Sequence, residues 1–111
     1  MDKSLIQGSM MMLILKLLEE KDMYGYEMID TLHHRSNKTF ELKAGSLYPL
    51  LHSLETKSYV NSYEDDSTGK KRKYYHITRE GKKCLKNKEQ EWNEYQHAVV
   101  SVMSYGKGVL V

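Results

Sequence analysis

A block of four consecutive basic residues, Lys70-Lys71-Arg72-Lys73, is the part of this sequence with the clearest chemistry. The chain has 17 Lys and Arg against 15 Asp and Glu, so the residues outside the block carry 13 basic against 15 acidic side chains. The excess of positive charge is therefore local. Such a block favours contact with phosphate groups, although a solvated turn rich in lysine would show the same run.

A second group of polar side chains follows helical spacing between residues 46 and 55. Ser46 is a suitable N-cap, and Pro49 is tolerated if it lies in the first turn of the helix. The predicted apolar side of this helix consists of Leu47, Leu50, Leu51 and Leu54. The open side then carries Ser46, Tyr48, Pro49, His52 and Ser53. Side chains of this kind on one helix can contact base edges in the major groove of B-DNA.

Catalytic or metal chemistry has little support in the sequence. Cys84 lies in a basic helical stretch with Lys82, Lys83 and Lys86, but no histidine is placed beside it by the sequence. The histidines lack zinc-type spacing, and a single cysteine cannot form an intrachain disulfide. We therefore expect no enzyme activity, no metal and no cofactor.

The apolar runs and the N-terminal residues bear on location. The longest apolar run, Met10 to Leu18, is about half the length of ~20 residues that a spanning helix needs. No charged and then apolar leader opens the chain. We expect a cytoplasmic protein that does not enter the membrane.

The polar groups above must be positioned by a series of short elements. Periodicity predicts helices over about 4–20 and 24–34, the helix that starts at Ser46, and strands over 59–64 and 71–78 joined by a Gly-containing turn. In the second strand Tyr75 and Ile77 share the inward face, so Arg72, Tyr74 and His76 point the other way. Thr78 is predicted to cap a long helix from Arg79 to about Met103.

Apolar residues on this last helix follow a seven-residue repeat that suits one partner helix. They are Leu85, Trp92, Tyr95, Val99 and Val102. The first helix is apolar almost all round, so one of its sides also needs a partner. Because 111 residues bury only a modest core, we expect a homodimer held by the first and last helices.

The order of these elements predicts a mainly α fold with a two-stranded β-wing. We expect a winged helix-turn-helix DNA-binding domain over residues 1–78, a C-terminal dimerisation helix over 79–103 and a tail over 104–111 that frays. The third helix would enter the major groove, and the hairpin, or wing, would bring its cations to phosphates or to the minor groove.

The sequence also resembles the PadR-like family of transcriptional regulators. Three motifs carry the resemblance: Tyr24-Gly25-Tyr26-Glu27, the segment Gly45-Ser46-Leu47-Tyr48-Pro49-Leu50-Leu51-His52-Ser53-Leu54-Glu55, and the segment from Arg72 to Thr78 leading to Gly81. The single C-terminal helix is similar to that of the smaller subfamily. The chain departs from the family at Ser58, where many members have Gly.

The resemblance implies a winged-helix dimer that represses transcription until a small effector binds. It implies groove-facing roles for Ser46, Tyr48, Pro49 and His52, wing contacts for Lys70, Lys71, Arg72 and Tyr74, and a position near the DNA backbone for Tyr26. Some relatives hold flat aromatic compounds between two tryptophans. Here that resemblance implies an effector site with Trp92 and, on the first helix, Met11, Met12 and Leu15. The alternative is that Trp92 is only a large packing anchor.

Two further interpretations remain open at this level. A winged helix can serve as a protein-interaction module that binds no operator, and the apolar surfaces would also suit a hydrophobic-ligand carrier. The basic block argues against the carrier. Binding to a near-palindromic duplex with a steep salt dependence would distinguish a DNA-binding protein from both.

Overall fold

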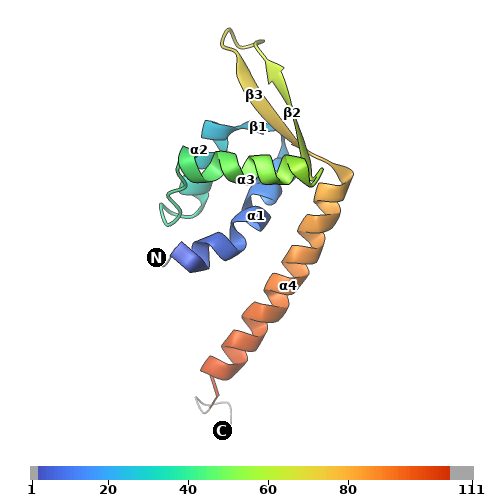
Figure 1. The fold of residues 1–111 in the computed structure, drawn as a ribbon. Helices are drawn as coiled ribbons and strands as arrows, with labels where there is room; N and C mark the ends of the chain where they lie inside the picture. The colour runs from blue at the N-terminus through green and yellow to red at the C-terminus, as the bar shows by residue number, and fades with distance from the viewer. Residues whose placement is uncertain (1–2, 106–111) are drawn as a thin grey trace.

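The computed structural model describes residues 3–105, with side chains from residue 8 onward. Its elements follow in the order α1 (Lys3–Glu20), β1 (Met23–Tyr24), α2 (Gly25–Arg35), α3 (Ala44–Thr56), β2 (Val60–Asp65), β3 (Arg72–Ile77) and α4 (Arg79–Met103). Figure 1 shows the β2–β3 hairpin projecting from one end of the group formed by α1, α2 and α3, while α4 runs away from that group. The predicted class, mainly α with a β-wing, is confirmed. Most of the predicted tail, residues 106–111, lies outside the described residues.

The hydrophobic core receives a side chain from each of these elements. On α3 the spacing of Leu47, Leu51 and Leu54 puts all three on one face, and none of them is exposed. Tyr75 and Ile77 point inward from β3 as predicted. The buried apolar side chains are Met10, Ile14, Leu15, Leu17, Leu18, Met23, Met28, Leu32, Leu47, Leu51, Leu54, Val60, Tyr75, Ile77 and Leu85.

The sheet has three strands rather than the predicted two. β1 pairs antiparallel with β3 through Met23↔Tyr75 and Tyr24↔Tyr74, which gives the strand order β1-β3-β2. A strand of two residues is too short to show the alternation on which a sequence prediction rests. Its effect is to tie the base of the wing to the start of α2.

The third helix begins before the residue predicted to cap it. Lys43 is the N-cap, and its backbone oxygen accepts hydrogen bonds from the Ser46 and Leu47 amides at 3.0 and 2.9 Å. Ser46 is therefore inside the helix, and the N-cap prediction was wrong. Pro49 consequently lies beyond the first turn, where it removes the hydrogen bond to the Gly45 carbonyl. Both residues are exposed, so water can satisfy that carbonyl.

A left-handed residue ends α3 and directs the chain into the wing. Ser58 has φ +63°, and the hydrogen bonds Ser58 N–H to Glu55 O and Tyr59 N–H to Leu54 O, both 2.9 Å, form a Schellman turn. This conformation explains why glycine suits the position better than serine.

The start of α4 is fixed by a cap and by a close approach of two backbones. The Thr78 hydroxyl accepts a hydrogen bond from the Gly81 amide at 3.0 Å, as predicted for an N-cap. A Cβ atom at Gly81 would lie 2.1 Å from the Tyr59 carbonyl oxygen, so only glycine fits there. From residue 90 to residue 103 every side chain of α4 is exposed. The radius of gyration, 16.8 Å, exceeds the roughly 13 Å of a compact domain of this size because α4 projects from the rest.

Candidate nucleic-acid interface

The outward side of α3 carries the polar residues that the sequence placed there. Ser46, Tyr48, Pro49 and His52 are exposed, because the opposite face of the helix is held in the core by its leucines. Ser53 is only half-exposed. The three polar side chains and the Pro49 ring form a short exposed surface on a helix that is anchored along its whole length.

Tyr48 differs from its neighbours because its ring lies against the start of α2. A Cβ atom built on Gly25 would be 2.3 Å from the Tyr48 hydroxyl oxygen and 2.7 Å from the ring carbon that bears it. Gly25 is therefore required for space, and the Tyr48 hydroxyl is directed toward the first turn of α2. The sequence indicated both residues but gave no sign of their contact, because they are separated by 23 positions.

A cleft of about 480 Å³ lies between α2, α3 and the wing. Its lining residues are Tyr24, Gly25, Tyr26, Tyr48, Lys70, Lys71, Arg72 and Lys73. No side chain among the described residues caps the first amides of α2, and helix N-termini attract anions. The cleft therefore combines a helix N-terminus, two tyrosines with exposed side chains and four cations, which is suitable chemistry for a phosphate.

The four cations of the block differ in the contacts they make within the protein. Lys71 forms an ion pair with Glu64 at 2.8 Å, and this hydrogen bond raises the pKa of Lys71. The Arg72 guanidinium lies over the Tyr24 ring, 4.3 Å from its centroid. Lys73 lies 3.9 Å from Glu55, whereas Lys70 forms no ion pair with any described residue. Lys70 is therefore the cation of the block most available to a ligand.

Aromatic rings cover the outer face of the sheet. The Tyr74 ring stacks on Tyr63, with centroids 5.8 Å apart, and meets the edge of Tyr24 at 5.5 Å. Tyr74 is thus half-buried between two other tyrosines. The predicted wing contact is engaged in the sheet itself, and its neighbours Tyr24 and Tyr63 were not recognised from the sequence.

Asp22 connects this outer face to the turn between α1 and β1. Its carboxylate accepts a hydrogen bond from the Tyr63 hydroxyl at 2.6 Å and lies 2.8 Å from His76 Nδ1. Partial burial raises the pKa of Asp22, but the hydrogen bonds from Tyr63 and His76 outweigh this effect and hold that pKa below its ordinary value. The hydrogen bond between Tyr63 and Asp22 raises the pKa of Tyr63 to about 12.

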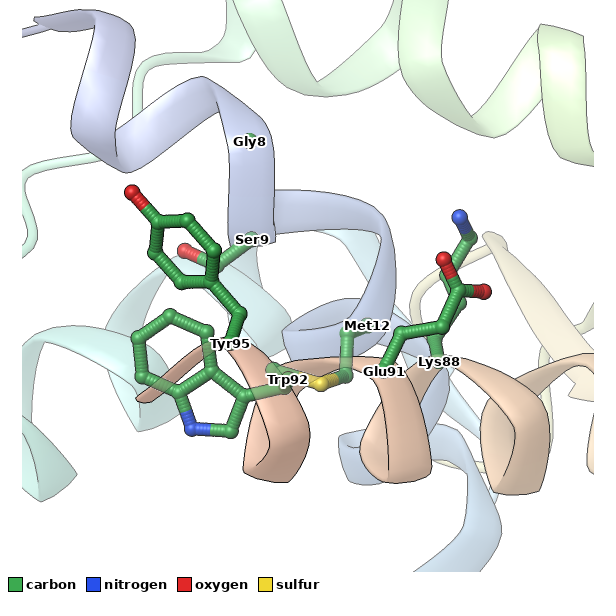
Figure 2. Close-up of a pocket in the computed structure, with 7 residues that line it drawn as sticks. All are labelled: Gly8, Ser9, Met12, Lys88, Glu91, Trp92 and Tyr95. Carbon is green, nitrogen blue, oxygen red and sulfur yellow. The ribbon is translucent and has the colours of Figure 1, made fainter. Parts of the chain in front are cut away.

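A second pocket, of about 360 Å³, lies between α1 and α4 beside the only tryptophan of the chain. Figure 2 shows Met12 reaching toward Trp92 from α1, with Tyr95 alongside the indole. The two aromatic centroids are 6.3 Å apart. Gly8, Ser9, Lys88 and Glu91 complete the lining.

Leu15, which was predicted for the effector site, and Leu85, which was predicted for the dimer interface, lie in the core instead. Leu15 has no exposed surface, so it cannot contact an effector in this structure. Leu85 is 1% exposed and packs within its own chain, which leaves almost no surface for a partner. In both cases the helical period identified an apolar position, but it could not tell which apolar face the domain itself buries. Met11 is half-buried and does not line the pocket.

The outer part of α4 exposes large apolar side chains. Trp92 is 43% exposed and Val102 75% exposed, and Tyr95 and Val99 lie between them on the same predicted stripe. Val100 and Met103 are exposed as well, and so is Tyr105 just after the helix. Apolar surface of this extent on one helix indicates an interface.

The described residues contain neither a membrane-spanning helix nor a metal-binding cluster of side chains. Within residues 3–105 no helix combines the length and the apolar character needed to cross a bilayer. Within the same range no group of three or more His, Cys, Asp and Glu side chains is placed to hold a metal ion.

The family resemblance is confirmed by comparison with known proteins. A sequence model described as "Transcriptional regulator PadR-like family" matches residues 14–87, which include the cleft, α3 and the wing. An uncharacterized protein of Lysinibacillus sphaericus is 40% identical over 96 residues, which are 86% of this chain and 88% of that protein.

Solved structures support the same relationship. A transcriptional regulator from Clostridium thermocellum is 34% identical with a TM-score of 0.82, over 88% of this chain and 96% of that one. A PadR family transcription regulator from Clostridium difficile is 37% identical with a TM-score of 0.75, over 86% and 98%. Since the family model covers more than half of the chain, this protein belongs to the PadR-like family of transcriptional regulators, which bind DNA and are not enzymes.

Proposed function

We propose that this regulator is a repressor that binds a near-palindromic operator as a homodimer and is released by a flat aromatic effector. The cleft between α2, α3 and the wing is the observation that carries the proposal, because it joins four cations to a helix N-terminus beside the polar side of α3. A protein of this kind acts where the DNA is, which supports the cytoplasmic location expected from the sequence.

We divide the DNA contacts between bases and backbone. Ser46, Pro49 and His52 lie on the open side of α3, so they are suited to base edges in the major groove. The Tyr48 hydroxyl lies against Gly25 in the basic cleft. We therefore assign Tyr48, together with Tyr26, to contacts with phosphates, although the sequence placed Tyr48 among the residues that contact bases. The wing cations Lys70, Lys71 and Arg72 add affinity with little sequence information, and Tyr74 supports them from the sheet.

The apolar stripe of α4 supports the homodimer. Trp92, Tyr95, Val99 and Val102 lie on one side of a helix whose side chains are all exposed from residue 90 to residue 103. A second copy of α4, together with the outer side of α1, would cover them. The two α3 helices would then contact half-sites about one helical turn, or roughly 34 Å, apart.

The pocket beside Trp92 supports the effector. Trp92, Tyr95 and Met12 offer flat aromatic and flexible apolar contacts. In a homodimer the same three residues of the second subunit would offer equivalent contacts. A molecule inserted there would change the angle between the arms and hence the spacing of the two α3 helices. The effector can weaken operator binding only by as much as its affinity for the altered state exceeds its affinity for the DNA-binding state.

Alanine variants test the division of DNA contacts. His52→Ala should reduce the discrimination between operator and random duplex by ~1–3 kcal/mol. Lys71→Ala and Arg72→Ala should weaken binding to both duplexes alike and reduce the log–log salt slope by about 0.9 per lost phosphate contact. A change of sequence preference caused by the wing variants, without one caused by His52→Ala, would refute the division.

Light scattering tests the dimer. Val99→Asp places a charge on the stripe and should give monomers or a much weaker dimer. Ser101→Asp adds the same charge on the opposite side of α4 and should leave the dimer intact. A wild-type chain that is monomeric at tens of micromolar would refute this part of the proposal.

Trp92 fluorescence tests the effector. A planar aromatic dye should quench or shift this emission and lower operator affinity. Trp92→Phe should weaken dye binding while the dimer content stays the same. Dye affinity that is unchanged in this variant, measured through the dye's own signal, would show that Trp92 is only a packing residue.

A further inference from the structure

Two carboxylates connect the wing to the body of the domain, one on each face of the hairpin. On the outer face Asp22 contacts Tyr63 of β2 and His76 of β3, at 2.6 and 2.8 Å. On the inner face Glu55 of α3 accepts a hydrogen bond from Ser62 of β2 at 2.9 Å and lies 3.9 Å from Lys73 of β3. Each carboxylate therefore bridges the same two strands.

The sheet register places these two contacts on opposite sides. Tyr63 pairs with Tyr74, and His76 with Asn61, so Tyr63 and His76 share the outer face. Ser62 pairs with Tyr75, whose ring is buried in the core. Ser62 and His76 lie in the half of the strands near the base, and Tyr63 and Lys73 lie farther out. The hairpin is thus held from both sides along its strands, while residues 66–71 at its tip are all exposed.

The length of the hairpin makes its angle at the base important. Six residues per strand extend about 20 Å, so a tilt of about 10° at the base would move the tip by roughly 3–4 Å. A displacement of that size breaks a hydrogen bond to a phosphate. Backbone pairing restrains the tilt only weakly, because β1 contributes two residue pairs to the sheet.

The negative charge of Asp22 is a second reason to infer that its role is to hold the structure of the wing. An acidic side chain near a DNA-binding surface opposes the binding of phosphates. Asp22 is nevertheless placed next to the wing and has both of its oxygens engaged there.

We propose that Asp22 is a positioning residue that holds the wing at the angle from which its cations reach the DNA backbone. This inference depends on the proposed role of the wing in DNA binding. Glu55 holds the inner face from α3, so the two contacts together fix the wing relative to the helix that enters the major groove.

Replacing an aspartate by alanine tests the proposal, because the positioning role and simple electrostatics predict opposite changes in DNA affinity. Asp22→Ala and Asp66→Ala each remove one negative charge from the wing region. The Asp66 side chain is exposed and forms no hydrogen bond or ion pair with any described residue. Electrostatics alone predicts tighter DNA binding for both variants. Loss of positioning predicts that Asp22→Ala binds roughly 3- to 10-fold more weakly with a lower salt slope, while Asp66→Ala binds as tightly as wild type or tighter.

A double-mutant cycle isolates the positioning role. If the wing of Asp22→Ala has already lost its phosphate contacts, then adding Lys71→Ala should cost much less than it costs in the wild-type chain. The cost of His52→Ala should be the same in both backgrounds. Tyr63→Phe removes one of the two Asp22 hydrogen bonds but keeps the stacked ring, and it supplies a second variant if Asp22→Ala does not fold.

The possible results separate this inference from the proposed function. Operator binding that tightens in a folded Asp22→Ala or Tyr63→Phe variant, or costs that simply add in the cycle, would overturn the positioning role. Lys71→Ala and Arg72→Ala that leave wild-type affinity and salt slope unchanged would instead refute the wing contacts themselves, and the positioning role would fail with them.

Discussion

Replacing Gly25 by alanine would put a methyl group into the space that the Tyr48 hydroxyl occupies. The new Cβ atom would lie 2.3 Å from that oxygen and 2.7 Å from the adjoining ring carbon, so the ring has to move. The ring is 41% exposed, and it can turn away from α2 without disturbing the core. The substitution therefore moves one proposed phosphate contact and leaves the rest of the fold in place.

The expected effects on stability and on DNA binding differ in size. Alanine favours the helix over glycine by up to about 1 kcal/mol, and the lost Tyr48 packing offsets this gain, so the free energy of unfolding should change by less than about 1 kcal/mol. A hydrogen bond to a charged phosphate contributes about 1.5–3 kcal/mol, and losing the one from Tyr48 should weaken binding roughly 10- to 150-fold.

Fluorescence anisotropy on a labelled operator, in wild-type and Tyr48→Ala backgrounds, measures this effect. Gly25→Ala should weaken binding in the first background and have little effect in the second. Gly45→Ala is the control for stability, because a Cβ atom there meets nothing within 4 Å. Equal losses in the two backgrounds, or no loss in the first, would refute the role assigned to the Gly25–Tyr48 contact.

Three further predictions concern stability. Ser58→Gly relieves the left-handed backbone at φ +63° and should raise the free energy of unfolding by about 0.5–1 kcal/mol and Tm by roughly 2–8 °C in a thermal melt; a lower Tm would contradict the strain. Gly81→Ala forces a Cβ atom to within 2.1 Å of the Tyr59 carbonyl oxygen and should destabilise by roughly 3 kcal/mol in urea unfolding, whereas a loss below about 1 kcal/mol would show that α4 can shift freely. Because the pKa of Asp22 is lowered in the folded chain, the stability it contributes is present above its ordinary pKa of 3.8 and is lost as pH falls below that value. Melts from pH 7 to pH 3 should therefore show a smaller acid loss in Asp22→Asn than in wild type, and parallel curves would contradict the Asp22 bonds.

Local sequence signals predicted most of the fold. Thr78 and the residues after it marked the start of α4 because a cap and a helical period are short-range features, and the alternation in β3 placed Tyr75 and Ile77 inward. The same signals failed at the start of α3, where a backbone carbonyl of Lys43 serves in place of the expected Ser46 cap. They also failed at β1, which is too short to alternate.

The candidate site was predictable in composition but not in arrangement. Exposure on α3 follows from its period, and the basic block is visible as a run of letters. The contacts of Asp22 with Tyr63 and His76 join residues 41 and 54 positions apart, and no local pattern indicates them. The same limit applies to Leu15 and Leu85, whose apolar character was clear but whose burial depends on how α1 and α4 pack.

Selection of bound sequences from a library of random DNA duplexes, with the full chain as bait, tests the central claim most directly. The account predicts enrichment of an inverted repeat whose half-site centres lie about 10 base pairs apart, with affinity for the selected duplex that falls steeply as salt rises. Enrichment of no sequence, or of a sequence without two-fold symmetry, would contradict a dimeric operator-binding regulator.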